Sequence, residues 1–498
     1  MIGEGIKVDE RPMKKIVIAG GGTSGWMAAA ALAKHLGTLI DITLVESDEI
    51  GTIGVGESTI PTSRTFHQFM QIDEREFMQA TGSTFKLGIM FEDWARIGDR
   101  FMHSFGTVGR GTRMIDFHHF WLEGRRQGSA SDLGDYCFEL QAALASKFAT
   151  SDQASINYAY HLDATAYGKY LRTIAEANGV KRVEGKISSV GQNSASGDIE
   201  TLTLESGQSV SGDLFIDCTG FRSLLIEQTL GAGYEDWSRW LPTDRALALQ
   251  TEPVAPAVPY TRAIAHSAGW QWRIPLRQRV GNGIVYSSAH MSDDEARSTL
   301  LGSIAGSPLM EPRLIRFQAG RRRKTWSHNC IALGLSSGFV EPLESTSIHL
   351  VMIAITRLIE NFPFGDISPA QVNRFNQQSS REIEAIRDFI ILHYHLTERD
   401  DSDFWRHCRT MPIPDSLADR IELFRSTAHV YQDSHDLFRI DSWAQVMLGQ
   451  RLLPADHHRA VGLVPPDQLR ESLHHVKANI AAAVSRMPTH AEFLAAQG

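Results

Sequence analysis

The sequence is poor in cysteine and has no excess of basic charge. Only four cysteines occur in 498 residues, and no two of them form a CxxC pair. This usage favours neither a disulfide framework nor a structural zinc site and is typical of a reducing compartment, so we expect a cytoplasmic protein. The formal net charge of −9 provides no broad positive field for phosphates. Nucleic acid is therefore not expected as a partner.

Long apolar runs are also missing. No stretch approaches the roughly 20 residues that a membrane-spanning helix needs, and the first residues lack the basic-then-apolar layout of a signal peptide. We therefore expect no membrane partner. The chain instead has 42% hydrophobic residues, 41 glycines against 18 prolines, and 10 tryptophans. This globular composition predicts a large core and argues against a disordered chain.

The most readable motif lies near the start of the chain. The β-branched run Ile16–Ala19 predicts a buried parallel strand, and a glycine-rich turn and an alanine-rich helix over Trp26–Leu36 follow it. A second predicted strand, Ile42–Val45, ends at Glu46. This order, with glycines in a GxGxxG pattern, predicts the β-α-β unit of a Rossmann-like dinucleotide-binding fold.

The three glycines of the pattern have separate roles. Gly20 allows the tight turn, Gly22 lets the backbone approach a pyrophosphate, and Gly25 allows close packing of helix on strand. The phosphates would lie at the helix N-terminus, and Glu46 would accept hydrogen bonds from ribose hydroxyls. NAD and FAD both use such a unit, so this motif alone leaves the nucleotide open.

A later segment favours FAD. The run Gly212–Gly220 contains an apolar strand that ends at Asp217. It resembles the second flavin-binding element of aromatic hydroxylases, in which an acid at a strand end holds the ribityl chain. By itself the run is equally typical of a buried strand that ends in a turn. Beside the glycine pattern it favours a flavin.

Four segments together resemble those of the flavin-dependent tryptophan and indole halogenases. The specific one is WxWxIP, formed by Trp270, Trp272, Ile274 and Pro275. In the family, its two tryptophans are credited with preventing direct hydroxylation by the flavin. They are also typical of two aromatic residues on one face of a strand. The other segments are FKLGI from Phe85, GVGESTIP from Gly54 and GFVEPLESTSI from Gly338.

The resemblance, which runs from about Lys15 to about His457, implies a fold. We expect the Rossmann-like α/β FAD-binding fold of the aromatic-hydroxylase type, with an interleaved and mainly helical substrate module. The whole of 1–498 would be one intertwined unit. Its FAD-binding module would come mainly from 14–100, 160–235 and 315–362, and its substrate module from the intervening segments and 365–498.

The resemblance also implies an activity. The protein would use FADH2, oxygen and a halide, chloride or bromide, to form hypohalous acid that halogenates an indole-type arene. No NAD(P)H site is recognised in the sequence, so a separate NAD(P)H-dependent flavin reductase would supply the FADH2. The other expected partner is a small aromatic substrate, and a homodimer is left open.

Position by position, the resemblance assigns Lys86 and Glu344 as the catalytic pair. Burial lowers the pKa of an amine that can then hydrogen-bond or accept electrophilic halogen, and a carboxylate can take the proton that the ring loses. Without the resemblance, the residues are more typical of a helix lysine whose amine reaches the surface and of an acid at a helix N-terminus stabilised by the helix dipole. Ser345 would link the flavin side to the substrate side. The halide would lie at the amides of Thr346 and Ser347, where the family usually has glycine in place of Ser347.

The remaining expected site residues contact flavin or substrate. The flavin contacts are Gly20, Gly22, Thr23, Ser24, Gly25, Glu46, Ser47, Glu57, Ile187, Asp217, Leu335 and Ile348. His103 and Phe105 match a family segment that flanks the indole, and Trp443 is a candidate third wall, although each is also typical of an ordinary aromatic position. Residues that bind the amino-acid group of tryptophan are not matched. This favours indole, a substituted indole or a larger indole-bearing molecule.

Two alternative functions stay open: a flavin-dependent aromatic monooxygenase that hydroxylates its substrate, and a non-catalytic flavin- or indole-binding protein. WxWxIP and Lys86 argue against the first, and the presence of both Lys86 and Glu344 argues against the second. Two further runs predict no chemistry. Arg321–Lys324 is expected to be an exposed strand or loop, although it could steer an anion. His393–His395 has no apparent partner ligands, so we expect no metal.

Overall fold

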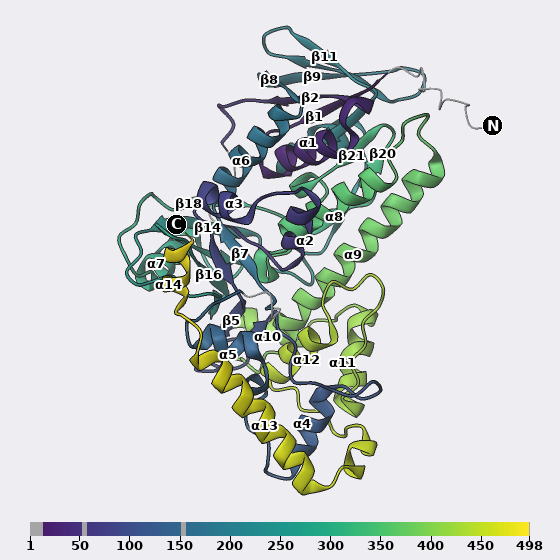
Figure 1. The fold of residues 1–498 in the computed structure, drawn as a ribbon. Coiled ribbons are helices and arrows are strands. Elements are labelled where there is room, and N and C mark those ends of the chain that lie inside the picture. Colours follow the sequence, from purple (N-terminus) through teal and green to yellow (C-terminus); the bar gives the residue numbers. More distant parts are fainter. Residues whose placement is uncertain (1–12, 52–56, 151–155, 498) are drawn as a thin grey trace, which may run out of the picture.

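A mostly parallel sheet forms the upper part of the molecule (Figure 1). The computed structural model describes residues 13–51, 57–150 and 156–497. β1 (Lys14–Ala19) pairs in parallel with β2 (Ile40–Glu46) and β12 (Leu214–Asp217). Residues 16–19 are all buried, as expected for a strand covered on both faces. The strand order is β20-β21-β12-β1-β2-β8, with β20 (Trp326–Ser327), β21 (Cys330–Ala332) and β8 (Lys181–Glu184).

The predicted β-α-β unit is confirmed. α1 (Thr23–Leu36) connects β1 to β2, and its run of alanines is buried. Because alanine side chains are small, α6 (Ala164–Ala177) and α8 (Ser347–Glu360) pack closely against α1. β21 ends at Ala332, just before the short 3-10 turn η5 (Gly334–Ser336).

A second, mainly antiparallel sheet lies beside the first. Its strand order is β18-β14-β17-β16-β15-β5-β6. The strands expected between Trp270 and Tyr286 are β16 (Gly269–Pro275) and β17 (Val280–Tyr286). The other strands are β18 (Arg313–Arg316), β14 (Arg245–Thr251), β15 (Thr261–His266), β5 (Gly88–Glu92) and β6 (Arg100–Ser104). β5 pairs in parallel with β15, so an early segment of the chain joins this sheet to the rest.

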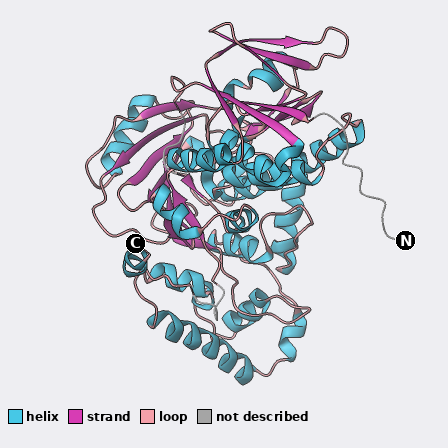
Figure 2. Cartoon of the chain, turned by 45° about the horizontal axis from the view of Figure 1, so that its top comes forward, coloured by secondary structure: helices cyan, strands magenta, loops and turns pink. Residues whose placement is uncertain are grey.

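Helices form the lower part of the molecule (Figures 1 and 2). The long helix α9 (Pro369–His395) connects the two parts, because it contacts β20 near its start and α10, α11 and α12 near its end. It begins at Pro369, because Ser368 caps it and proline suits the first turn of a helix. The other C-terminal helices here are α10 (Asp403–Thr410), α11 (Asp415–Thr427), α12 (Ile440–Gly449) and α13 (Pro466–Ser485), and α13 leads up to α14 (His490–Ala496), which lies beside α7 (Asp293–Ser303) in the view of Figure 1.

Smaller elements complete the described part of the chain. One small sheet, β3 (Glu57–Ser58), β7 (Ala159–Leu162) and β4 (Thr84–Lys86), carries several site residues. The remaining strands are β9 (Ile187–Gln192), β10 (Ile199–Leu204), β11 (Ser209–Ser211), β13 (Tyr234–Asp236), β19 (Gly320–Arg322) and β22 (Gly338–Phe339). The remaining α-helices are α2 (Thr62–Phe69), α3 (Glu74–Thr81), α4 (Phe117–Arg126), α5 (Phe138–Leu144) and α7 (Asp293–Ser303).

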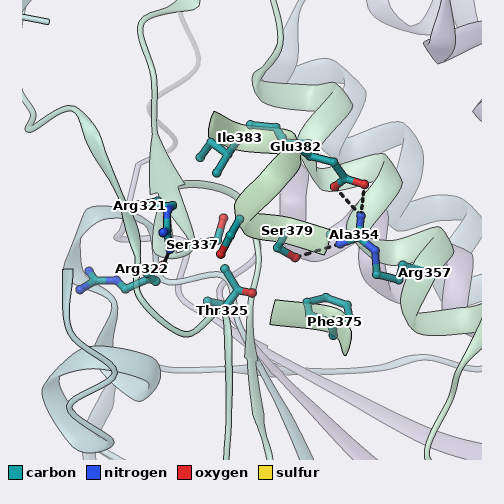
Figure 3. Close-up of a pocket in the computed structure, with 13 residues that line it drawn as sticks. Arg321, Arg322, Thr325, Ser337, Ala354, Arg357, Phe375, Ser379, Glu382 and Ile383 are labelled. Atoms are coloured by element: carbon teal, nitrogen blue, oxygen red, sulfur yellow. Dashed lines mark hydrogen bonds and ion pairs between the residues drawn. The ribbon is translucent and has the colours of Figure 1, made fainter. Parts of the chain in front are cut away.

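The expectation of an exposed Arg321–Lys324 run is wrong for its first half. Arg321 forms ion pairs of 2.8 and 2.7 Å with two glutamates, and Arg322 is buried and pairs with Glu227. Figure 3 shows the small cavity that these arginines line together with residues of α8 and α9. Because the protein itself supplies the opposite charges, these two side chains hold the fold together here.

No helix among the described residues has both the length and the apolar character needed to cross a membrane.

Candidate active site

The turn between β1 and α1 forms a cradle for a nucleotide. Gly20 has a φ of +105°, and a Cβ there would lie 2.3 Å from the carbonyl oxygen of Cys218, so only glycine fits. A Cβ at Gly22 would meet nothing within 4 Å, which leaves this face of the backbone open. The first turn of α1 carries no acid, and its amides have no intrahelical acceptor. The cradle therefore fits an anionic pyrophosphate.

The two predicted flavin-binding acids differ in what they contact. Glu46 lies at the end of β2, over Gly21, and its Oε1 pairs with Arg182 at 2.6 Å. Asp217 is fully buried, and its Oδ2 accepts from two amides of the following turn, at 2.8 Å each. Its Oδ1 accepts from Thr219 and from the hydroxyl of Ser336. These internal bonds make Asp217 a residue that shapes the loops around the cradle, and its contact with a ribityl chain stays a prediction.

The other predicted flavin contacts lie on several elements. Thr23, Ser24 and Gly25 form the first turn of α1, where the Ser24 hydroxyl lies beside Gly334 of η5. Leu335 and Ile348 follow in η5 and at the start of α8, Ser47 follows β2, and Ile187 lies in β9. The side chain of Glu57 and the segment around Gly54 lie outside the described residues.

Lys86 lies on β4 and is 0% exposed. Its Nζ donates to the carbonyl oxygen of Thr59 at 3.2 Å and to Oγ of Ser345 at 2.8 Å. Phe105 lies across from it, with its ring centroid 5.1 Å from Nζ. Burial lowers the pKa of this amine to about 7, although the charge of Glu344 opposes part of that shift.

Glu344 ends the 3-10 turn η6 (Pro342–Glu344) and is also 0% exposed. Nδ1 of His103 lies 2.9 and 3.0 Å from its two oxygens, and Nε2 of His393 lies 2.9 Å from Oε1. Burial by itself raises the pKa of this carboxyl, but the two imidazoles outweigh burial and lower it to about 2. Glu344 is therefore ionised throughout the neutral range.

His393 is a site residue that the sequence analysis missed. Its Nδ1 donates to the carbonyl oxygen of Phe389 at 2.8 Å, so Nε2 carries a proton toward Glu344 only when the imidazole is charged. The short Nε2 contact lies outside hydrogen-bond angles, and we interpret it as an electrostatic contact. The sequence feature that could have pointed to it is a histidine one turn after Phe389, near the buried end of α9.

The predicted aromatic walls are not all brought to the same place. His103 contacts Glu344 rather than standing free, and Phe105 faces Lys86. Trp443 is buried, with its ring 4.8 Å from that of Phe389, and among the described residues its ring does not contact that of His103. Phe438, which the sequence analysis missed, stacks on Phe389 at 3.7 Å and lies 6.0 Å from His103.

The WxWxIP motif holds the segment that leads to Glu344. Trp270 Nε1 donates to Oε2 of Glu341 at 2.9 Å, and Tyr394 donates to the same oxygen. The ring of Trp272 lies 6.2 Å from that of Trp270, and its Nε1 has no hydrogen-bond partner among the described residues. At the end of the motif, after Ile274, the carbonyl oxygen of Pro275 accepts from β4. The structure thus gives the motif an anchoring role, while the shielding role stays a prediction.

The start of α8 fits a small anion. Thr346 is buried, and its Oγ1 has no partner among the residues described. No acid lies in the first turn of α8, which begins at Ser347. Ser345 has a φ of +59° while Ser347 does not lie in the left-handed region, so a side chain at the family's usual glycine position causes no backbone strain. In the described ranges, no cluster of three or more histidine, cysteine, aspartate or glutamate side chains suits a metal.

The fold and this site define a nucleotide-binding α/β enzyme with a buried amine and a buried carboxylate close enough for their charges to interact. The family model described as tryptophan halogenase matches residues 15–466. The solved structure of Xcc4156, a flavin-dependent halogenase from Xanthomonas campestris, is 52% identical with a TM-score of 0.96, covering 98% of this chain and 99% of that one.

Two further proteins are similar over nearly their whole length. BrvH, a flavin-dependent halogenase from Brevundimonas sp. BAL3, is 45% identical with a TM-score of 0.93, over 98% of this chain and 99% of its own. Tryptophan 6-halogenase SttH of Streptomyces toxytricini is 34% identical over 99% of both chains. The chain therefore belongs to the tryptophan halogenase family. It is a flavin-dependent oxidoreductase with the Rossmann-like FAD-binding fold.

Proposed function

We propose that the protein uses FADH2, oxygen and chloride or bromide to halogenate an electron-rich, indole-type arene. The observation that carries this proposal is the pair of fully buried groups, the Lys86 amine and the Glu344 carboxylate, in one site. When bound, reduced flavin supplies the electrons with which oxygen converts halide to hypohalous acid. A separate NAD(P)H-dependent flavin reductase delivers the FADH2.

Lys86 holds the electrophilic halogen beside the substrate. With a pKa lowered to about 7 by burial, a large share of the amine is neutral at neutral pH and nucleophilic. Its lone pair attacks the halogen of hypohalous acid, the oxygen–halogen bond breaks, and one amine proton joins the departing hydroxide as water. The ring of Phe105 provides an apolar wall next to this nitrogen.

Glu344 takes the proton that the ring loses. The arene's π electrons bond to the halogen, and the nitrogen–halogen bond breaks with its electron pair left on nitrogen. The carbon that gained halogen releases its proton to the carboxylate, and a proton returned from the carboxylate to the nitrogen restores the neutral amine. His103 and His393 keep that carboxylate ionised before the step, since they lower its pKa to about 2. His103 is therefore a partner of Glu344 in this proposal as well as a wall for the substrate.

Indole itself or a substituted indole fits the proposal better than free tryptophan. The Phe105 ring beside the Lys86 amine belongs to a buried apolar cluster with Ile60 and Ala159, and Leu437 packs against this cluster. The chain has no match for the family residues that bind the amino-acid group of tryptophan. A flat apolar ring without that charged group suits such a lining.

The test supplies the purified protein with a flavin reductase, FAD, NADH, oxygen, bromide and indole, and analyses the products by mass spectrometry. We expect bromoindole from the wild type and none above background from Lys86→Met. Lys169→Met, on the exposed face of α6, is the matched control and should retain full activity. Glu344→Gln keeps the shape and removes the base, so we expect a strong loss of product with the protein still folded.

Two outcomes would replace this proposal. Hydroxylated indole formed with or without halide would identify an aromatic monooxygenase. Flavin binding without any product from a panel of arenes would identify a binding protein that has kept the fold.

A further inference from the structure

A continuous chain of buried hydrogen bonds leads away from Lys86. Its Nζ donates to Ser345 Oγ at 2.8 Å, and Ser345 Oγ donates to Ser58 Oγ at 3.1 Å. Ser58 Oγ lies 3.3 Å from Thr261 Oγ1, which lies 3.0 Å from Nε2 of His161. All of these side chains are buried, so water does not interrupt the sequence of contacts.

The far end of this hydrogen-bond chain fixes its direction. Thr84 Oγ1 donates to the carbonyl oxygen of Pro275 at 2.7 Å, and a hydroxyl has only one proton to donate. Thr84 therefore accepts from Nδ1 of His161, 3.1 Å away. The proton of the neutral imidazole is then on Nδ1, and Nε2 is an acceptor.

The donor and the acceptor of each hydrogen bond between His161 and Lys86 follow from this assignment. Thr261 donates to Nε2 of His161, so it accepts the proton of Ser58, and Ser58 in turn accepts the proton of Ser345. Ser345 has no second proton, so toward Lys86 it is an acceptor only. A neutral amine has two N–H bonds and one lone pair. Thr59 and Ser345 accept both N–H bonds, which leaves the lone pair as the free position.

We propose that His161, acting through Thr261 and Ser58, is a positioning residue that makes Ser345 accept from Lys86 and so keeps the amine's lone pair free for electrophilic halogen. The inference rests on the proposed function, because only a halogen-accepting amine needs a free lone pair. If the chain of bonds is broken, the Ser345 hydroxyl is free to donate to the lone pair and block it.

The charged surroundings support a neutral His161. Lys86 and His490 are the ionisable groups that face its imidazole, and burial together with both of them lowers its pKa well below the usual value. Lys86 is faced in turn by Glu344, which raises its pKa, and by His161. His161 therefore keeps its single proton on Nδ1 over the range in which Lys86 titrates.

The test breaks the hydrogen-bond chain at two places with the intact enzyme. Thr261→Val keeps the shape and removes a hydroxyl, and Ser58→Ala removes the neighbouring one. We expect kcat for indole bromination to fall about tenfold in each variant, the effect of one added hydrogen bond on the lone pair, with KM for indole nearly unchanged. The double variant should be no worse than either single, because each change already frees Ser345.

Two further variants separate this role from loss of packing. Thr261→Ser keeps the hydroxyl and should restore most of the lost kcat. Thr81→Val removes a buried hydroxyl that bonds within α3 and to the next loop, and so reports the general cost of such a change. A wild-type kcat in Thr261→Val would overturn the proposal. A double variant whose loss of kcat equals the product of the two single losses would overturn it as well.

A second readout does not depend on halogenation. The pKa of Lys86 can be followed by NMR through the Cε shift in protein labelled with 13C-lysine. Because the neutral amine gains a hydrogen bond in both single variants and in the double variant, its pKa should fall below the wild-type value by the same amount in all three. An unchanged pKa would contradict the positioning role. A wild type that makes no halogenated product would instead refute the proposed function, whatever the NMR shows.

Discussion

Lys86 and Glu344 are equally buried, yet burial controls the ionisation of only one of them. The acceptors of Lys86 are a carbonyl and a hydroxyl, which are neutral, so desolvation prevails and lowers its pKa to about 7. Glu344 faces His103 and His393, and the charges of both, together with the hydrogen bond from His103, prevail over desolvation and lower its pKa to about 2. The same depth of burial thus yields a nucleophile and a base side by side.

The buried amine makes stability depend on pH in a predictable direction. Between its folded pKa of about 7 and the ordinary lysine pKa of 10.5, the unfolded chain holds a proton on Lys86 that the folded chain lacks. This group therefore makes the free energy of unfolding rise with pH, by about 1.4 kcal/mol per pH unit in that window. Lys86→Met removes this pH-dependent contribution to the free energy of unfolding.

We expect the stability advantage of Lys86→Met over the wild type to be largest at pH 7 and to shrink steadily toward pH 10. Urea unfolding at several pH values measures it. A difference between the two proteins that does not change with pH would show that the amine keeps its ordinary pKa when folded.

His393 sets the ionisation of Glu344 in a way that activity reports. With His393→Phe, the carboxyl keeps one imidazole partner and burial counts for more, so its pKa rises. For wild type and variant alike, log kcat for indole bromination falls as the pH is lowered. In His393→Phe this fall should begin at higher pH and be steeper, with kcat about tenfold lower near pH 6. His407→Ala, on the exposed side of α10, is the control. An unshifted profile would remove His393 from the site.

At the scale of elements, what the sequence predicts well is local. β1, α1 and β2 follow from a β-branched run, a glycine turn and an alanine-rich helix, each visible within a few residues. In contrast, without the resemblance Lys86 reads as a helix lysine, but it lies on the short strand β4, whose partner β7 is more than seventy residues later. Pairing over such a separation leaves no local pattern.

The segment from β22 to α8 is held by a buried carboxylate, and two tryptophans offer a matched test of it. Trp270→Phe removes the N–H that binds Glu341, whereas Trp272→Phe removes an N–H without a partner among the described residues. Both changes lose similar volume. We expect Trp270→Phe to lower the free energy of unfolding by about 1.5–3 kcal/mol more than Trp272→Phe, the usual contribution of a hydrogen bond to a charged group.

Product analysis of the same two variants checks the functional consequence. Since Glu341 positions the turn that carries Glu344, Trp270→Phe should make less bromoindole without making hydroxyindole. Equal stability and equal activity of the two variants would show that the bond to Glu341 does not position the turn. Hydroxyindole from either variant would favour the shielding role that the resemblance implies.

At the scale of the whole molecule, the site joins segments that are far apart in the sequence. Ser58, Lys86 and His103 come from the first quarter of the chain, and Glu344 and His393 from the last third. The sequence predicted most of these residues only through the resemblance, because their types and spacings do not show which elements meet. His393 was passed over because its partner lies on another element, 49 residues earlier by the numbering.

The end of the chain takes part in this assembly through His490 on α14. Its Nε2 accepts from the amide of Phe85, next to Lys86, at 3.2 Å, and its Nδ1 donates to the carbonyl oxygen of Ala257 at 2.7 Å. His490→Leu leaves the buried amide of Phe85 and the partly buried carbonyl of Ala257 without this partner, so we expect a loss of about 2–4 kcal/mol in the free energy of unfolding.

The same change should loosen β4 and lower kcat for indole bromination, while flavin affinity, measured by fluorescence titration, stays near the wild-type value. The reason is position: the nucleotide cradle lies at β1 and α1, at the other end of the sheet region from α14 (Figure 1). His475→Leu, on the exposed face of α13, controls for the loss of a histidine. Equal losses of flavin affinity and kcat in His490→Leu would mean that α14 supports the whole fold rather than the strand that carries Lys86.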